Sequence, residues 1–285
     1  MGSFSILNNI AGLNAQSQLN VNNINLTRTL LRLSSGKRVN SGADDAAGLQ
    51  IADSLRANVR ALDQAVRNAN DGISVAQIAD GALQEISNIL TRAVTLAEEA
   101  ATSTVDSAGR ASINAEFGQI QAEIARIATQ TNFNGVGIFT AGGLNGSLGV
   151  FVGDLSTTST INVTVDTITA SGDTVTNLGG VDLSGVSLTT ATGAQSALTT
   201  IKNSLAGVSS SRAEIGSGMN RLQSAVAVLQ SQSQNTQAAE SVIRDANVAE
   251  EVANLTKFQI LAQSGISALA QANLNSQLVL SLLQQ

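Results

Sequence analysis

Apolar residues recur every three or four positions over long stretches of this 285-residue chain, which is the spacing of one face of an α-helix. The longest run alternates steps of four and three without a break, at Leu55, Val59, Leu62, Val66, Ala69, Ile73 and Ala76. A second run spans Ile113 to Ile127, and a third spans Leu198 to Leu229. The pattern predicts three amphipathic helices with coiled-coil-like seams.

The first of these helices contains a turn-like Asn-Asp-Gly stretch at residues 70–72. Ala69 and Ile73 keep the same heptad phase on either side of it, and a loop rarely preserves that phase. One helix is therefore predicted to run through the stretch, from about residue 43 to about residue 100. At 1.5 Å per residue its length is about 85 Å, so the predicted body is elongated.

Between the second and third helices the chain becomes rich in Thr, Ser, Val and Gly. Ile161, Val163 and Val165 alternate with polar residues, which is typical of half-exposed strands. About 50 residues are enough for a few strands and hairpins but marginal for an independent domain. A small β insertion is predicted here.

Both chain ends carry a further 3.5-residue repeat in which polar residues occupy some seam positions. Matching stripes predict that the two terminal helices pair, and apolar residues beside the stripes indicate that each helix needs more than one neighbour. The residues expected at these contacts are Ile6, Ile10, Leu13, Ile24 and Leu31 at the N-terminal end, and Val252, Leu255, Ile266, Leu269, Leu280 and Leu283 at the C-terminal end.

The last charged residue is Lys257, so an apolar helical stripe closes the chain with no charge in its final 28 residues. Such a stripe must be buried, and other copies of the chain would supply the neighbours. A head-to-tail contact that does not close into a ring propagates as a helical filament. The alternative is a helical hairpin inside the chain's own monomeric core.

Composition narrows the function further. The chain has a net charge of −6 and contains no His, Cys or Pro. The negative charge argues against nucleic acid as a partner. Without His and Cys the commonest general base, the commonest transition-metal ligand and any cysteine nucleophile or thiolate ligand are missing, so we expect no enzyme activity, no metal and no cofactor. No stretch approaches 18 apolar residues, which predicts no membrane insertion.

Two polar motifs are weak as chemical sites. Gly36-Lys37 lacks the remaining residues of a phosphate-binding loop, because Leu31 and Arg38 stand where Gly and Ser or Thr are needed. The stretch is better interpreted as a connector in which Gly36 and Gly42 relieve backbone strain. The adjacent carboxylates Asp44-Asp45 and Glu98-Glu99 point in different directions on a helix, so neither makes a converging pair.

Three segments resemble bacterial flagellin. They are residues 8–83, beginning "NNIAGLNAQSQLN"; "TNFNG" at residues 131–135; and residues 240–285, beginning "ESVIRDANVAEEVANLTKFQ". The likeness covers about residues 1–140 and 195–285. The resemblance implies a structural subunit of the extracellular flagellar filament, working in motility, without enzymatic activity.

The resemblance also implies an architecture. The fold class is mainly α with a small β insertion: an elongated antiparallel helical bundle plus a terminal two-helix coiled coil, assembling into a helical filament. The implied domains are an inner tube of residues 1–42 and 245–285, a rod of residues 43–140 and 194–244, and an insertion of residues 141–193. The expected partner is the chain itself, with the flagellar type III export apparatus, a chaperone, and the hook-junction and cap proteins.

In flagellins that an innate Toll-like receptor of a host recognises, the contact surface lies on the rod helices. By resemblance, Arg92, Leu96 and Glu116 occupy the corresponding positions, where they serve either receptor contact or contacts between subunits. A hook–filament junction protein would have terminal helices of the same kind and is the alternative to a filament subunit. An enzyme is disfavoured, because residues 141–193 contain no His, Cys, Glu, Lys, Arg or Tyr.

Overall fold

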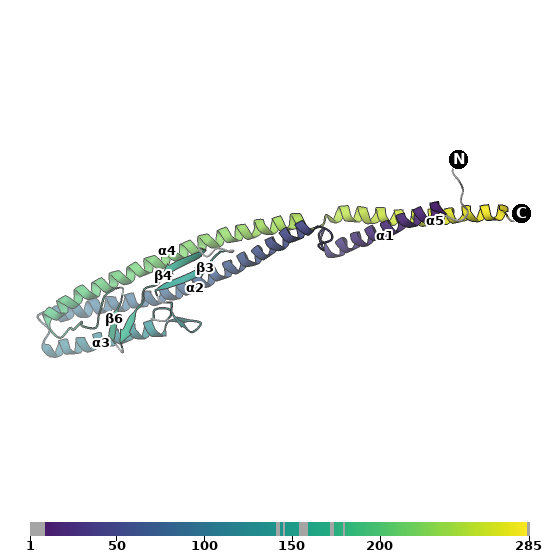
Figure 1. The fold of residues 1–285 in the computed structure, drawn as a ribbon. Coiled ribbons are helices and arrows are strands. Elements are labelled where there is room, and N and C mark those ends of the chain that lie inside the picture. The colour runs from purple at the N-terminus through teal and green to yellow at the C-terminus, as the bar shows by residue number, and fades with distance from the viewer. Residues whose placement is uncertain are drawn as a thin grey trace. The chain divides into compact units, whose positions relative to one another are not determined.

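Long helices dominate the computed structural model, which describes residues 9–140, 143–144, 146–153, 159–171, 174–178 and 180–283 (Figure 1). The helices are α1 (Ile10–Ser35), α2 (Ala46–Ala101), α3 (Ser107–Gln130), α4 (Ala191–Arg244) and α5 (Val248–Leu283). The short strands are β1 (Asn132–Phe133), β2 (Val136–Gly137), β3 (Ser147–Phe151), β4 (Thr160–Thr164), β5 (Thr169–Ser171) and β6 (Thr174–Asn177). This confirms the predicted fold class, mainly α with a small β insertion.

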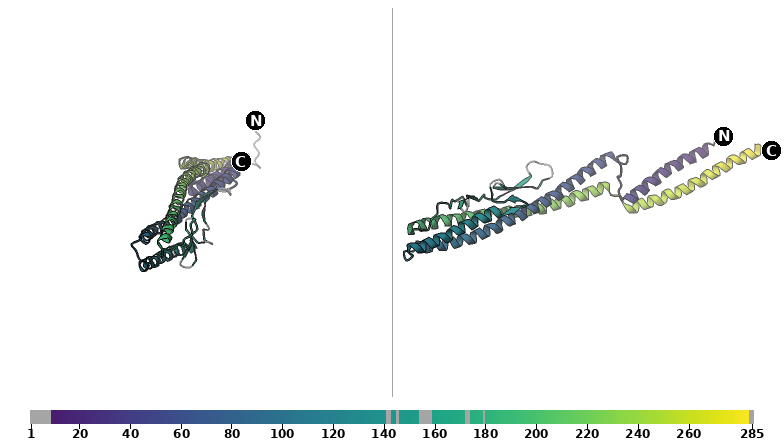
Figure 2. Two further views of the ribbon diagram at one scale, coloured as in Figure 1. Left: turned by 90° about the vertical axis from the view of Figure 1, so that its left-hand side faces the viewer. Right: turned by 90° about the horizontal axis from the view of Figure 1, so that it is seen from below.

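The chain divides into two compact units. The first contains Met1–Ala57 and Asn235–Gln285, and the second contains Asn58–Gln234. Within the first unit, α1 and α5 lie side by side (Figure 2). Within the second unit, α2, α3 and α4 lie alongside one another, and the strands cover them (Figures 1 and 2).

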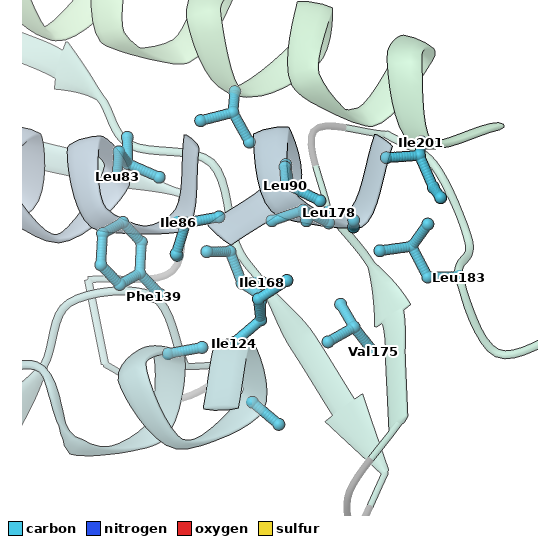
Figure 3. Packing of buried hydrophobic residues seen from close by; sticks show 14 of the residues in the cluster. Leu83, Ile86, Leu90, Ile124, Phe139, Ile168, Val175, Leu178, Leu183 and Ile201 are labelled. Atoms are coloured by element: carbon cyan, nitrogen blue, oxygen red, sulfur yellow. The ribbon is translucent and has the colours of Figure 1, made fainter. Parts of the chain in front are cut away.

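One hydrophobic core holds the second unit together (Figure 3). Leu83, Ile86 and Leu90 of α2 meet Ile124 of α3 and Ile201 of α4 in it, and each is at most 3% exposed. Phe139, Ile168, Val175, Leu178 and Leu183 enter the same cluster from the strand region and the segments beside it. The predicted seam positions of the three helices are buried or half-buried; on α2, Leu62, Ala69 and Ala76 are buried, and the seam positions between them are half-buried.

Polar contacts fix how α2 and α4 lie along one another in antiparallel order. Arg212 Nε of α4 lies 2.8 Å from Asp80 Oδ1 of α2, and this hydrogen bond raises the pKa of the Arg212 guanidinium. Lys202 Nζ lies 3.9 Å from Glu98 Oε1, and Ser233 Oγ donates to Asp63 Oδ1 at 3.0 Å. Because the residue numbers fall on one helix as they rise on the other, these contacts share one register.

The Asn-Asp-Gly stretch lies inside α2, as predicted, and packing accounts for its glycine. A Cβ at Gly72 would lie 2.5 Å from Val150 Cγ2 of β3, and a Cβ at Gly218 of α4 would lie 2.6 Å from Val163 Cγ1 of β4. Strands β3 and β4 pair with each other in antiparallel register. The β3–β4 hairpin therefore sits close on both helices because each helix lacks a side chain beneath it.

The alternation predicted at residues 161–165 is confirmed. Val163 and Val165 are buried and Ile161 is half-buried, whereas Asn162 and Thr164 are exposed. The β1–β2 hairpin was not predicted from the hydrophobic pattern. Its signal was present, because Asn134 and Gly135 join the strands with φ of 50° and 79°, the left-handed values that a tight Asn-Gly hairpin turn needs.

Substituting Gly72 or Gly218 with Ala is expected to lower the free energy of unfolding by about 1–3 kcal/mol, because the added methyl overpacks the hairpin contact. Gly81→Ala on α2 is the matched control, since no atom lies within 4 Å of a Cβ at that position. The control should stabilise the chain by up to about 1 kcal/mol through helix propensity. Urea unfolding followed by circular dichroism compares the three variants; equal effects at Gly72 and Gly81 would contradict the packing interpretation.

Candidate functional site

The face that α1 turns inward, toward α5, is unusually polar. Its most buried residues are Gly12, Asn22 and Thr29, and Asn22 is only 8% exposed. Asn22 Nδ2 donates to the backbone oxygen of Phe258 in α5 at 2.9 Å. Three half-buried leucines complete this inner face at spacings of seven residues: Leu19, Leu26 and Leu33. The pairing surface of α1 therefore mixes small, polar and apolar side chains.

The outer face of the same helix pair exposes many large apolar side chains among its polar ones. In α1, Ile10 is 63% exposed and Leu13 is 61% exposed. In α5, Ile266 is 60% exposed. Other large apolar side chains are exposed on these two helices: Val21, Ile24, Leu30, Leu31, Val248, Val252, Ile260, Leu261 and Leu274. Monomeric soluble proteins rarely expose this much apolar surface, which is characteristic of a binding interface.

The structure corrects how the predicted stripes face. Ile10, Leu13, Ile24 and Leu31 were expected to meet the C-terminal stripe, but they point away from α5. Gly12, Asn22 and Thr29 take the inner positions instead, because small and hydrogen-bonding residues permit close approach between the helices. A Cβ at Gly265 of α5 would lie 3.1 Å from Leu19 Cγ, which shows how close the backbones come.

The C-terminal stripe is divided between the two faces. Val252 and Ile266 are exposed, whereas Leu255 and Leu269 are half-buried. Ile6 lies outside the described residues. Leu280 and Leu283 belong to α5, but their side chains lie outside the described part of the chain.

The connector between α1 and α2 is held by backbone hydrogen bonds to the segment between α4 and α5. Gly36 ends α1 with φ of 69°, as its predicted role in relieving strain requires, and its oxygen accepts from Ala246 N at 3.0 Å. Arg38 N donates to the oxygen of Arg244 at 2.7 Å. Asp45 then caps α2, because its Oδ1 accepts from Gly48 N at 2.9 Å.

An ion network lies beside this connector, within the first unit. Arg244 Nη1 lies 3.0 Å from Asp53 Oδ1, and Arg56 Nε lies 3.0 Å from Glu240 Oε1. The Arg244 side chain is 11% exposed, and Glu240 also lies within 4.0 Å of it. The network ties the first turns of α2 to the last turns of α4.

Asp44 anchors the connector itself. Its Oδ2 accepts from Ser41 N and from Ser41 Oγ, each at 3.0 Å. The backbone hydrogen bond from Ser41, followed by the hydroxyl bond, lowers the pKa of the Asp44 carboxyl below its ordinary value. The two neighbouring carboxylates thus have separate structural roles, with Asp45 as a helix cap and Asp44 as a turn anchor.

The rod residues singled out by resemblance are only partly brought together. Arg92 donates to Glu116 Oε1 from both Nε and Nη2, at 3.0 and 2.7 Å, and both side chains are exposed. Leu96 does not join this surface. It is 2% exposed because it packs with Ala93, Ala97 and Ala100 on the core side of α2, which corrects its expected place on a contact surface.

Chemistry-bearing side chains do not converge elsewhere in the described ranges. No group of three or more acidic, His or Cys residues among the described residues could hold a metal ion. None of the helices in the described part of the chain combines the length and hydropathy of a membrane span. The apolar outer face of α1 and α5 is therefore the candidate functional site.

Comparisons with known proteins agree on one family. Residues 6–142 match the bacterial flagellin N-terminal helical region, and residues 198–283 match the bacterial flagellin C-terminal helical region. Flagellin FlaB1 of Treponema pallidum is 36% identical over 287 residues, covering 98% of this chain and 99% of the relative. A flagellin of Halalkalibacterium halodurans is 37% identical, with the same coverage of both chains.

Among solved structures, the crystal structure of Bacillus cereus flagellin is 27% identical to this chain. It covers 61% of this chain and 94% of its own length, with a TM-score of 0.45.

Asp44 should protect the connector backbone from hydrogen exchange to an extent that depends on pH. Because its pKa is lowered in the folded chain, the bond stabilises the connector above the ordinary value of 3.8 and is lost as the pH falls below it through the folded value. Hydrogen exchange of residues 36–45, corrected for intrinsic rates, should therefore speed up at acid pH. Asp44→Asn is the control, since it cannot titrate; the same pH dependence in that variant would exclude Asp44 as the cause.

Proposed function

The chain belongs to the bacterial flagellin family, and we propose that the apolar outer face of α1 and α5 is the surface through which its copies polymerise. The chain is a structural subunit of the extracellular flagellar filament, which serves motility, and it is not an enzyme. Relatives named flagellin or flagellar filament core protein align over nearly its full length, and nothing favours the hook–filament junction alternative.

One observation carries the proposal: α1 and α5 pair through a partly polar face and expose their apolar residues. Ile10, Leu13 and Ile266 are each at least 60% exposed in the single chain. A subunit of a polymer buries such residues against neighbouring copies, and each buried side chain contributes about 1.5–3 kcal/mol to association. The proposed contacts are Ile6, Ile10, Leu13, Ile24, Leu31, Val252, Leu255, Ile266, Leu269, Leu280 and Leu283.

The proposed domain organisation follows from the family. Residues 1–42 and 245–285 form the inner tube, residues 43–140 and 194–244 form the rod, and residues 141–193 form a compact insertion. The interruptions of helix between Ser35 and Ala46 and between Arg244 and Val248 support these bounds. We also propose that the terminal helices become fully ordered only on assembly.

Further partners are proposed from the family alone. They are the flagellar type III export apparatus and a chaperone before assembly, and the hook-junction and cap proteins at the filament ends. For an innate Toll-like receptor of a host, the exposed Arg92–Glu116 pair supports a contact surface on the rod helices. Leu96 is buried and is not proposed as a direct contact there.

The first test is polymerisation on short filament seeds, viewed by negative-stain electron microscopy. The full chain should form long uniform filaments, whereas a chain trimmed to residues 43–244 should stay unpolymerised though helical. If the full chain remains a compact, protease-resistant monomer under these conditions, its ends are folded into its own core and the proposed function is wrong.

Point variants give a sharper test. Leu13→Ser and Ile266→Ser should each raise the concentration needed for seeded growth by about tenfold or more, because each removes an apolar side chain from the proposed contact. Neither should change unfolding of the second unit, which contains neither residue. Gln263→Ser, also exposed on α5, is the matched control and should polymerise as the unsubstituted chain does.

A further inference from the structure

Polar side chains are the main specific link between α1 and α5. Asn9 Nδ2 donates to the oxygen of Ala272 at 3.1 Å, and Arg32 Nη1 lies 3.4 Å from Glu251 Oε1. Asn22 is the buried member of this set, donating to the oxygen of Phe258. Its orientation follows from chemistry, since a backbone carbonyl can accept only from the NH2 group of the amide.

Each of the three side chains Asn22, Arg32 and Glu251 has one buried polar atom without a hydrogen-bond partner in the described part of the chain. Asn22 Oδ1, Arg32 Nε and Glu251 Oε2 are buried and have no partner among the described residues. An unpaired polar atom removed from water opposes burial, whereas an apolar side chain in the same place would favour it. The inner face thus weakens the very contact that it forms.

The second unit provides the contrast within the same chain. Leu62 and Ala65 of α2 are each 1% exposed and cluster with Leu229 of α4, and the core extends through Ile201, Ile215 and Leu222 of α4. This chain can therefore build an apolar helix seam, yet it places Asn22 and Thr29 at the buried positions of α1. A single buried Asn in a helix pair is known to lower stability in exchange for specificity.

We propose that Asn22 sets the assembly threshold: its half-satisfied amide keeps the α1–α5 pair weak in an isolated subunit, so that stable pairing requires neighbouring copies. Neighbours contribute by covering the apolar outer face, which ties the ordering of the ends to their arrival. This inference rests on the proposed polymerisation, and it names the residue that regulates it. Glu251 of α5 adds to the effect, because its buried Oε2 also has no partner among the described residues.

Two substitutions at one position act in opposite directions. Asn22→Leu removes the unpaired oxygen and adds apolar surface, so it should strengthen the isolated pair about 5- to 30-fold. Asn22→Asp has nearly the same shape but cannot donate to the oxygen of Phe258 when ionised, so it should weaken the pair. The matched control is Asn23→Leu, which makes the same chemical change on the exposed side of α1.

The experiment measures hydrogen exchange of α1 in the unpolymerised full chain, and then the critical concentration for growth on seeds. Relative to Asn23→Leu, Asn22→Leu should slow exchange in α1 about 5- to 30-fold and lower the critical concentration. Asn22→Asp should move both quantities the other way. Comparison with Asn23→Leu removes the shared gain in helix propensity.

The outcomes separate the two proposals. If Asn22→Leu and Asn23→Leu give the same exchange rates and the same critical concentration, the inference about Asn22 is wrong, even though filaments form. If Asn22→Asp strengthens the pair, the inference is also wrong. If the unsubstituted chain never grows on seeds, the proposed function is wrong. The exchange rates of α1 still test the effect of Asn22 on the helix pair in that case, because they are measured in the isolated chain.

Discussion

The rest of the second unit depends on the burial of the α2 and α4 seams against each other and against α3. Leu83, Ile86 and Leu90 of α2 supply the centre of this core, which reaches α4 at Ile201. With no proline in the chain, helices of 56 and 54 residues continue without a break. Gly72 and Gly218 then admit the β3–β4 hairpin onto the helices, so the strands are held by the seam and do not form an independent core.

The first unit has the opposite distribution of polarity. Asn22 and Thr29 are buried between α1 and α5, while Ile10, Leu13 and Ile266 are exposed. In an isolated chain this arrangement leaves apolar surface in water, where the hydrophobic effect opposes it. In the proposed polymer, burial of the same surface would favour association. The contrast between the two units suits a subunit with a stable body and ends that become fully ordered only among copies of itself.

Electrostatic contacts fix the relative positions of the helices but contribute little to the free energy of unfolding. The Asp80–Arg212 and Glu98–Lys202 pairs are solvent-accessible, and such pairs contribute at most about 1 kcal/mol each. Their value is positional, because each bond joins one place on α2 to one place on α4. At the connector, Asp44 holds a turn and Asp45 caps a helix start. Beside it, Arg244 and Glu240 of α4 form ion pairs with Asp53 and Arg56 of α2.

The helices and the β alternation could be predicted from the amino-acid sequence alone. Heptad phase continued across residues 70–72, and a single helix is found there; Val163 and Val165 are buried as their alternation predicts. The excess of apolar residues at both ends also indicated that neighbours are needed. These properties follow from local spacing, which a sequence displays directly.

Which helix faces meet could not be predicted in this way and is seen only in the folded chain. The stripe of Ile10, Leu13, Ile24 and Leu31 was expected against α5, yet Gly12, Asn22 and Thr29 take that place. Leu96 was expected at a contact surface and is buried in the core. Hydrophobic periodicity shows that a face will be covered, but not by what. That depends on close approach and hydrogen bonds between residues far apart in the chain, such as Asn22 with Phe258 and Leu19 with Gly265.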